Sequence, residues 1–516
     1  NWPMLRAELL QMERLDIPFF EHLIDGEDLP LPEGLASIPK FIKISGLCAA
    51  RLRLNQLNQA EIEFQQRLIR GAIAAIQIKI SISAEPKSNA AIASESPLVD
   101  LNDYRQEAFQ LGQQLWDSAI RDSKSRPEWL GMDLGVDGES FHFGLIGICL
   151  YSGSSGIALL FARLALASEG STSELWKRRA WSCYENLDEL SERNNNDQLY
   201  RLVRDLPFGL SGSGGILLGL QLLKRAGLPD ADALAERLIS QLRPERLLAD
   251  ESVDVIGGVS GLIGPLLMVG TQRSLELANV CGDRLLSLQL DSGGWSAGVG
   301  KHPLTGFSHG AAGMGAALAQ LAQVSKEDRF AAGARQAVAY ERAVFDAEHG
   351  NWPDFRNSGD SADFMLSWCH GAPGILLARS VVIAADLADE HTAAELHSAR
   401  ITTLATLKQL PSFPGDTPAH LCCGALGLTS LLRVDAKINK LELTRELPIT
   451  ESALLRNAHA IGSYTFFNVD TGSLNLPGLF TGKAGVALAL IEAVDGLYWL
   501  PSVLSAGLLD VPSKAC

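Results

Sequence analysis

Hydrophobic residues along this chain follow two alternating patterns. Short segments such as 314–322 and 486–493 are almost entirely apolar, which is typical of a helix that is buried on every side. Longer segments carry apolar residues at helical spacing with charged residues between them, at 173–193, 231–242, 327–345 and 393–410. The alternation predicts an all-α protein built from pairs of inner and outer helices.

The apolar segments belong to an internal repeat. A Gly-x-x-Gly pair followed by small and apolar residues recurs in seven copies, whose first glycines are Gly153, Gly212, Gly258, Gly310, Gly371, Gly424 and Gly482. The steps between them are 59, 46, 52, 61, 53 and 58 residues. Units of this kind bury their apolar faces against their neighbours. We expect each repeat to be a loop, an inner helix and an outer helix.

Seven hairpins can satisfy one another by closing into a ring whose inner helices are parallel. The sequence therefore predicts an α/α toroid, a double-layered helical barrel, over residues 106–516. An open solenoid is the alternative, but the inner helices are too apolar to line a solvated concave face.

Residues 1–84 do not carry the repeat. They contain a helical pattern from residue 59 to residue 80, which predicts a short N-terminal helical extension. The polar, small-residue stretch from Ser83 to Ser96 indicates a linker, for which we expect the bounds 85–105.

Composition narrows the function. The chain has 44 Lys and Arg against 60 Asp and Glu, a net charge of -16, which argues against a nucleic-acid partner. No run of 18 apolar residues and no signal-type N-terminus is present, so we expect a cytoplasmic protein without a membrane span.

The cysteines provide the candidate chemistry. Eight scattered cysteines are too few for a disulfide scaffold in a chain of 516 residues. The vicinal pair Cys422 and Cys423 is typical of a metal or redox site, although two small buried apolar residues are the plainer interpretation.

Repeat register brings a third cysteine to this pair. If the inner helices are parallel, the residues just before each first glycine lie on one rim of the ring. Cys369 and Cys422 both stand two residues before their glycines, in consecutive repeats. Sulfur ligands select zinc over magnesium or calcium, and three of them leave one tetrahedral position open. We predict a zinc (Zn2+) site at Cys369, Cys422 and Cys423 that activates a thiol rather than water, because its thiolate shell is electron-rich.

Three more residues lie on the same rim. His309, one repeat earlier, is a candidate proton carrier, and Asp254 is a candidate to orient it or to take the proton. Capping or structural roles are the alternatives for both. His370 is a candidate fourth ligand, a group beside the metal or a substrate contact. The remaining histidines, including His420, share no register and are interpreted as surface or satisfied core groups.

These residues resemble a known family. The segments Gly306-Phe-Ser-His-Gly-Ala-Ala-Gly313, Ser367-Trp-Cys-His-Gly-Ala-Pro-Gly374 and Leu421-Cys-Cys-Gly424 are similar to the signature blocks of the lanthionine cyclases, and the resemblance covers about residues 110–500. Asp16-Ile-Pro-Phe-Phe20 resembles the end of the dehydratase domain of class II lanthipeptide synthetases. The chain is expected to be the C-terminal part of such a bifunctional enzyme.

The resemblance implies a reaction and a partner. Precursor-peptide cysteines, on a peptide with a leader and dehydrated Ser and Thr, would add to dehydroalanine or dehydrobutyrine to form lanthionine and methyllanthionine rings in antibiotic biosynthesis. Cys369, Cys422 and Cys423 match the zinc ligands, His309 the acid/base histidine, and Asp254 the aspartate near the metal. Many members have Cys-His where this chain has Cys422-Cys423, and the three-cysteine version resembles a subgroup that accepts varied precursors.

Two other functions compete with this interpretation. A toroidal zinc enzyme that alkylates thiols, such as a protein prenyltransferase, would use Asp and His ligands and an aromatic-lined funnel, whereas this chain has 7% aromatic residues. A non-catalytic toroid that binds thiols or peptides is the second alternative, and turnover on a dehydrated peptide distinguishes it.

Overall fold

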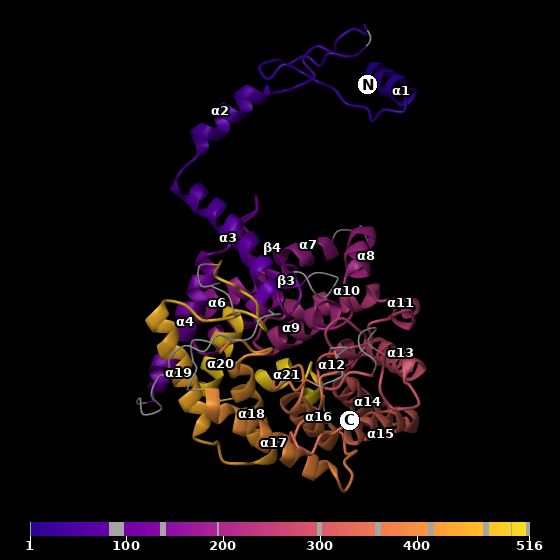
Figure 1. The fold of residues 1–516 in the computed structure, drawn as a ribbon, viewed down its shortest axis with the longest axis vertical. Coiled ribbons are helices and arrows are strands. Elements are labelled where there is room, and N and C mark those ends of the chain that lie inside the picture. The colour runs from indigo at the N-terminus through magenta and orange to yellow at the C-terminus, as the bar shows by residue number, and fades with distance from the viewer. Residues whose placement is uncertain are drawn as a thin grey trace. The chain divides into compact units, whose positions relative to one another are not determined.

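The computed structural model describes residues 2–32, 34–81, 98–134, 141–192, 196–296, 302–356, 363–410, 417–467, 474–496 and 498–511 (Figure 1). The chain forms two compact units, Asn1–Arg70 and Gly71–Cys516. The polar stretch at 83–96, predicted to be a linker, lies outside the described residues. Helix α4 (Leu101–Asp117) begins inside the range expected for the linker, because Asp100 caps its N-terminus by accepting a hydrogen bond from the Asn102 backbone N–H.

The smaller unit holds α1 (Trp2–Met12), α2 (Gly46–Gln56) and the first part of α3 (Gln59–Ser81). The helix expected from residue 59 to residue 80 is thereby confirmed. The core of this unit is small, with Ala7, Leu29 and Leu31 buried. A single backbone bridge pairs Leu29 with Ile38 among its described residues.

The larger unit is built on seven inner helices, one after each glycine pair. They are α5 (Ser154–Leu166), α9 (Ser213–Arg225), α12 (Ser260–Val269), α14 (Ala311–Ser325), α16 (Ala372–Ala384), α18 (Ala425–Asn439) and α20 (Lys483–Asp495). Each inner helix contacts the next one, and α20 contacts α5. The ring is therefore closed, which confirms the toroid and excludes the open solenoid.

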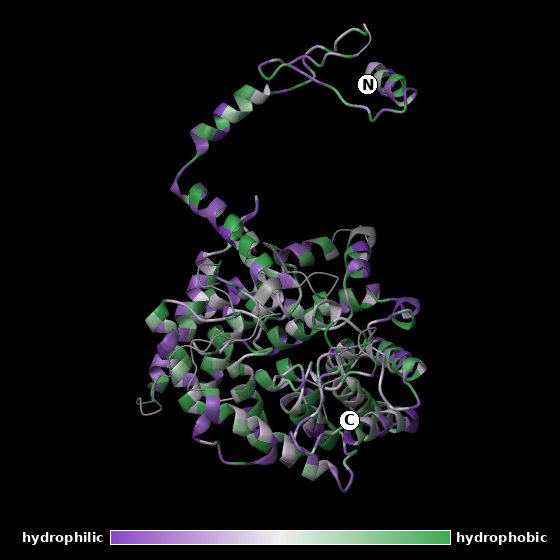
Figure 2. Cartoon of the chain, in the orientation of Figure 1, coloured by the Kyte–Doolittle hydropathy of each residue, from purple (hydrophilic) through white to green (hydrophobic). Residues whose placement is uncertain are grey.

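An outer helix packs on each inner helix. In repeat order these are α6 (Gly170–Ser182), α10 (Asp230–Gln241), α13 (Gln272–Leu288), α15 (Asp328–Ala343), α17 (Thr392–Gln409) and α19 (Glu446–Ile461). The outer partner of α20 is α4, which precedes the first repeat in the sequence. Hydrophobic and hydrophilic residues alternate along these outer helices (Figure 2), as their amphipathic pattern requires.

Smaller elements complete the described part of this unit. They are α7 (Glu185–Glu192), α8 (Asn196–Asp205), α11 (Pro244–Leu248), and two antiparallel pairs: β1 (Ile120–Arg121) with β2 (Pro127–Glu128), and β3 (Leu130–Leu134) with β4 (Phe141–Leu145). The prediction of a single outer helix at 173–193 is wrong. The chain turns at Cys183 and Tyr184, whose buried side chains pack into the core, and α7 starts afresh after them.

One rim of the ring is held by backbone hydrogen bonds that run from loop to loop through all seven repeats. The donors and acceptors are Tyr151 N to Leu210 O, Leu210 N to Val255 O, Val255 N to Ser308 O, Ser308 N to Cys369 O, Trp368 N to Cys422 O, Cys422 N to Phe480 O, and Phe480 N to Tyr151 O, at 2.9–3.3 Å. Because the last bond returns to the first loop, the residues before each inner helix have fixed positions relative to one another.

The C-terminal segment packs among the inner helices. Helix α21 (Leu500–Leu504) contacts α18 and α20, and η3 (Leu508–Asp510) contacts α12, α14 and α16. Trp499, Leu500 and Leu508 are fully buried. The Trp368 indole N–H donates to the Leu504 carbonyl at 2.9 Å, so this segment also supports the loop that carries Cys369.

Candidate functional site

Three cysteine sulfurs meet on the rim. Cys369 lies in the loop before α16, and Cys422 and Cys423 lie in the loop before α18. Sγ of Cys423 is 3.3 Å from Sγ of Cys369 and 3.3 Å from Sγ of Cys422, and all three lie within 4.8 Å of one another. Cys369 and Cys422 are buried, and Cys423 is the more exposed. The predicted convergence of these thiols is thus present, in a group that could hold a metal ion.

Glycines permit this close approach of loops. Gly306 has a φ of +91°, and a Cβ at this position would lie 2.6 Å from the carbonyl oxygen of Cys369. Gly371 caps α16 with a φ of +73°, and its Cβ would meet the Met365 carbonyl oxygen at 1.8 Å. Only glycine fits both positions without strain. The glycine-rich motifs therefore set the sulfur geometry as well as the helix starts.

The sulfurs are strongly coupled to one another. Hydrogen bonds from Cys422 and Cys423 hold the pKa of the Cys369 thiol well below its usual range. The same hydrogen bonds to Cys369 raise the pKa of Cys422 and of Cys423. Ser367 Oγ lies 3.0 Å from the Cys369 sulfur and accepts a hydrogen bond from the His370 backbone N–H. The cluster thus favours the thiolate form at Cys369, which is the form that binds a cation.

His309 and Asp254 form a pair beside the cluster. Asp254 Oδ2 lies 2.5 Å from His309 Nδ1, while its Oδ1 accepts hydrogen bonds from the backbone N–H groups of Gly257 and Gly258. Burial lowers the pKa of His309, but the hydrogen bond and charge of Asp254 outweigh it, so the net pKa is raised. The His309 side chain is 38% exposed. A histidine held at Nδ1 by a carboxylate, with its other nitrogen free to face a substrate, suits proton transfer near neutral pH.

His370 lies against the same pair. Its ring is stacked at 6.1 Å from the His309 ring, and the residue is only 1% exposed. Neither ring nitrogen has a hydrogen-bond partner among the described residues. Burial lowers the pKa of His370, which favours the neutral ring. Unpartnered buried nitrogens favour a partner that arrives with a ligand.

Two further residues of the cluster were not assigned a role from the sequence. Tyr151, in the loop before α5, donates its hydroxyl to the Cys422 sulfur at 2.9 Å. His420 Nδ1 accepts a hydrogen bond from the Cys423 backbone N–H at 3.2 Å, and burial lowers the pKa of His420 to about 4. His420 is a satisfied core histidine, as expected. Tyr151 carries a register signal that would have found it, because it stands two residues before Gly153, as Cys369 and Cys422 stand before theirs.

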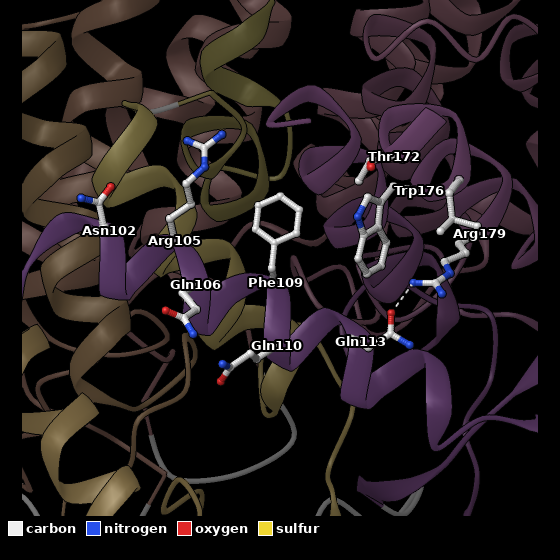
Figure 3. A pocket seen from close by; sticks show the side chains of 10 residues that line it. Asn102, Arg105, Gln106, Phe109, Gln110, Gln113, Thr172, Trp176 and Arg179 are labelled. Atoms are coloured by element: carbon white, nitrogen blue, oxygen red, sulfur yellow. Dashed lines mark hydrogen bonds between the residues drawn. The ribbon is translucent and has the colours of Figure 1, made fainter. Parts of the chain in front are cut away.

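A groove of about 650 Å³ lies elsewhere, on the outer surface between α4 and α6 (Figure 3). Phe109, Trp176 and Leu175 form its apolar part, and the Gln113 side-chain oxygen accepts a hydrogen bond from Arg179 at 2.9 Å. No residue of the sulfur cluster or of the His309–Asp254 pair lines it.

The fold and the site together define a class: a closed ring of seven helical hairpins with a sulfur cluster and a His–Asp pair on one rim. The family model for "Lanthionine synthetase C-like protein" matches residues 146–503. This match covers more than half of the chain, so the chain belongs to that family. Membership of the family supports cyclase activity.

One solved structure supports the fold. The chain is similar to "Nisin cyclase", with 17% identity, a TM-score of 0.55, and coverage of 80% of this chain and 100% of that one. A D-mannose isomerase structure (13% identity, 59% of this chain, 86% of that one) and an unsaturated glucuronyl hydrolase from Bacillus sp. GL1 (13%, 59%, 84%) both have TM-scores of 0.37. At those scores they carry no functional argument. No curated protein sequence matches the chain.

In the described parts of the chain, no helix combines the length and the apolar character needed to cross a bilayer.

Proposed function

We propose that this protein is a zinc-dependent cyclase that adds precursor-peptide cysteine thiols to dehydroalanine or dehydrobutyrine, forming thioether rings. One observation carries the proposal: the three sulfurs of Cys369, Cys422 and Cys423 lie beside the His309–Asp254 pair on one rim. Membership of the lanthionine synthetase C-like family supports the same reaction class.

The three thiols suit zinc as donors. Two of their separations are 3.3 Å, near the edge of about 3.8 Å expected for a tetrahedron with sulfur about 2.3 Å from zinc. Their hydrogen bonding already favours the thiolate form at Cys369. A zinc ion bound there would supply the Lewis acidity that keeps a substrate thiol deprotonated at neutral pH.

The proton balance then falls to the chain's own residues. The proton of the substrate S–H bond passes to His309, a carbon–sulfur bond forms at the β-carbon of the dehydroamino acid as the C=C π bond opens, and a proton must then reach the α-carbon. His309 delivers that proton, and its raised pKa favours the protonated ring that delivery requires. Asp254 holds the ring through Nδ1, leaving Nε2 to transfer the proton. His370 is buried beside the His309 ring with two unpartnered nitrogens, so we assign it a place beside the metal.

Residues 1–84 support a wider proposal. Their resemblance to the end of a dehydratase domain suggests a bifunctional class II synthetase, in which a dehydratase portion of the same protein prepares a leader-bearing precursor. We expect this chain alone, given ATP, magnesium and an unmodified precursor, to remove no water from Ser or Thr. Mass loss in steps of one water would contradict this division of labour.

Cyclisation adds no mass, so the test counts free thiols. The zinc-loaded chain and a pre-dehydrated, cysteine-containing precursor are incubated, alkylated and weighed by mass spectrometry. We expect alkylatable thiols to disappear with the native chain and with the control Cys48→Ala, whose cysteine is exposed and outside the cluster, but to persist with Cys423→Ala. Persistent thiols with the native, folded, zinc-loaded chain on several precursors would instead favour a thiol-binding scaffold.

A further inference from the structure

Tyr151 reaches the sulfur cluster from the first repeat, although 271 residues separate it from Cys422 in sequence. Its phenol ring stacks on Phe480 with centroids 4.8 Å apart and planes 10° apart. Phe480 in turn packs against Trp368 at 4.6 Å. Aromatic side chains from repeats one, seven and five thus form a continuous support under the cluster.

The backbone leaves this phenol little freedom. Phe480 N donates to the Tyr151 carbonyl at 2.9 Å, and Cys422 N donates to the Phe480 carbonyl at 3.0 Å. The donor hydroxyl and the acceptor sulfur are therefore fixed by two consecutive bonds of the rim. A hydrogen bond between groups held in this way costs little additional ordering.

Hydroxyl donors are distributed unequally over the three sulfurs. Cys422 accepts from Tyr151 at 2.9 Å, and Ser367 Oγ lies 3.0 Å from the Cys369 sulfur. Cys423, the more exposed sulfur, lies 3.3 Å from each of the other two sulfurs and accepts from no hydroxyl of the described residues. A hydrogen bond to a thiolate withdraws electron density and makes that sulfur a poorer nucleophile.

An electron-rich cluster that faces an electrophilic alkene carries a hazard. A ligand thiolate could itself add to the β-carbon of dehydroalanine, forming a carbon–sulfur bond while the α-carbon takes a proton from water. This reaction would inactivate the site. A hydroxyl that donates a hydrogen bond to the ligand sulfur weakens that sulfur as a nucleophile. The substrate sulfur, which accepts no such hydrogen bond, is then the better nucleophile.

Resting on the proposed function, we propose that Tyr151 is a positioning residue whose hydroxyl holds the Cys422 sulfur as a ligand and protects it from alkylation. The aromatic support and the rim hydrogen bonds keep the hydroxyl on this sulfur. Cys423 is then the ligand most open to modification.

The test compares Tyr151→Phe with Tyr340→Phe in the full chain. Tyr340 is the matched control, because its hydroxyl donates to the Pro303 carbonyl at 2.6 Å and touches no sulfur. Each protein is treated with limiting iodoacetamide, and labelling at each cysteine is followed by peptide mapping. In the zinc-loaded proteins, where Cys422 would be a ligand thiolate, removing its hydroxyl donor should speed Cys422 labelling by about three- to tenfold in Tyr151→Phe only. A Co(II)-loaded sample should show a shifted sulfur-to-cobalt absorption band in the same variant.

Equal Cys422 labelling in the native chain and Tyr151→Phe would overturn the role of Tyr151. The labelling ratio reads the hydrogen bond directly and does not require turnover. If the native chain shows no sulfur-to-cobalt band, the metal part of the proposed function fails, whereas a native chain that shows the band but labels Cys422 as fast as Tyr151→Phe contradicts only the role of Tyr151. The two failures are therefore distinguishable.

Discussion

The side chains of Asp254, His309 and His370 at the rim differ in their hydrogen-bond partners. Asp254 is fixed by two backbone N–H donors before it meets His309, so its carboxylate is held in position. His370, one residue after Cys369, has neither nitrogen bonded among the described residues. A histidine that is hydrogen-bonded to a carboxylate is oriented for proton transfer. A histidine without a hydrogen-bond partner can bind a new one. The two histidines of the site therefore have different proposed tasks.

The raised pKa of His309 predicts a pH profile. Because the protonated ring supplies the proton, the cyclisation rate should fall as pH rises through the His309 pKa. Asp254→Asn removes the charge that raises this pKa, so the alkaline limb should move to lower pH by about one unit. His309→Ala should slow turnover by about 10²- to 10⁴-fold. The rate would be measured from pH 5.5 to 9 by thiol alkylation and mass spectrometry.

The control for this profile is Asp346→Asn, which breaks another Asp–His pair, at 3.0 Å from His349 on an exposed turn. It should leave the alkaline limb unchanged. An unmoved limb in Asp254→Asn would show that the His309 proton does not control the rate.

At the scale of elements, a buried ion network joins three helices behind the cluster. Arg379 of α16 bonds Glu341 of α15 at 3.0 Å and Glu395 of α17 at 2.6 Å, and both Arg379 and Glu341 are almost fully buried. Glu341 also accepts from the Gly306 backbone N–H at 3.3 Å. Since Gly306 lies against the Cys369 carbonyl, this network positions the loop that supplies a sulfur.

Breaking this network should destabilise the larger unit. Arg379→Met leaves Glu341 buried without its cation, which should cost about 3–5 kcal/mol of unfolding free energy. Burial already raises the pKa of Glu341 to about 7. A raised folded pKa means that the contribution of Glu341 is fully present below its unfolded pKa and declines as pH rises toward 7. The loss in Arg379→Met should therefore be larger at pH 8 than at pH 5, as measured by urea unfolding.

Arg329→Met is the matched comparison, because Arg329 pairs with Asp283 on the surface with both side chains at least 40% exposed. Its cost should stay below about 1 kcal/mol. Equal losses in the two variants would mean that the buried network does not anchor α16.

At the scale of the whole molecule, stability and site depend on ring closure. Helix α20 contacts α5 and takes α4 as its outer partner, and Asp495 at the end of α20 pairs with Arg105 of α4 and with Arg163 of α5. The seven loops therefore cannot move independently. A ligand that joins the loops before α16 and α18 should stabilise the entire larger unit.

Metal removal tests this coupling. A zinc ion that binds the folded chain at a hundred times its Kd adds about 2.7 kcal/mol, so a chelator should lower the Tm by about 2–5 °C. Cys423→Ala should start at the lower Tm and respond little to the chelator. A Tm of the native chain that is indifferent to chelation would argue against a metal bound by these three cysteines.

Repeat register explains why so much could be predicted from the sequence alone. Because parallel inner helices place equivalent positions on one rim, the spacing of glycines was enough to predict the toroid and the proximity of Cys369, Cys422 and Cys423. The same register placed His309 and Asp254 in neighbouring loops, where they meet at 2.5 Å. Whether these residues act as ligands and proton carrier stays a prediction.

Contacts between distant segments were decided only by the tertiary structure. The pairing of α4 with α20 and the packing of the C-terminal segment among the inner helices join residues with no common local pattern. Tyr151 shares the repeat register of Cys422, but only the tertiary structure shows that its hydroxyl reaches that sulfur. The break at Cys183 and Tyr184 is similar, because burial of these side chains overrides a continuous helical periodicity. The sequence alone determines the repeating unit and its register, because hydrophobic spacing is local. Closure of the ring determines the contacts between repeats, because it decides which distant side chains lie next to one another.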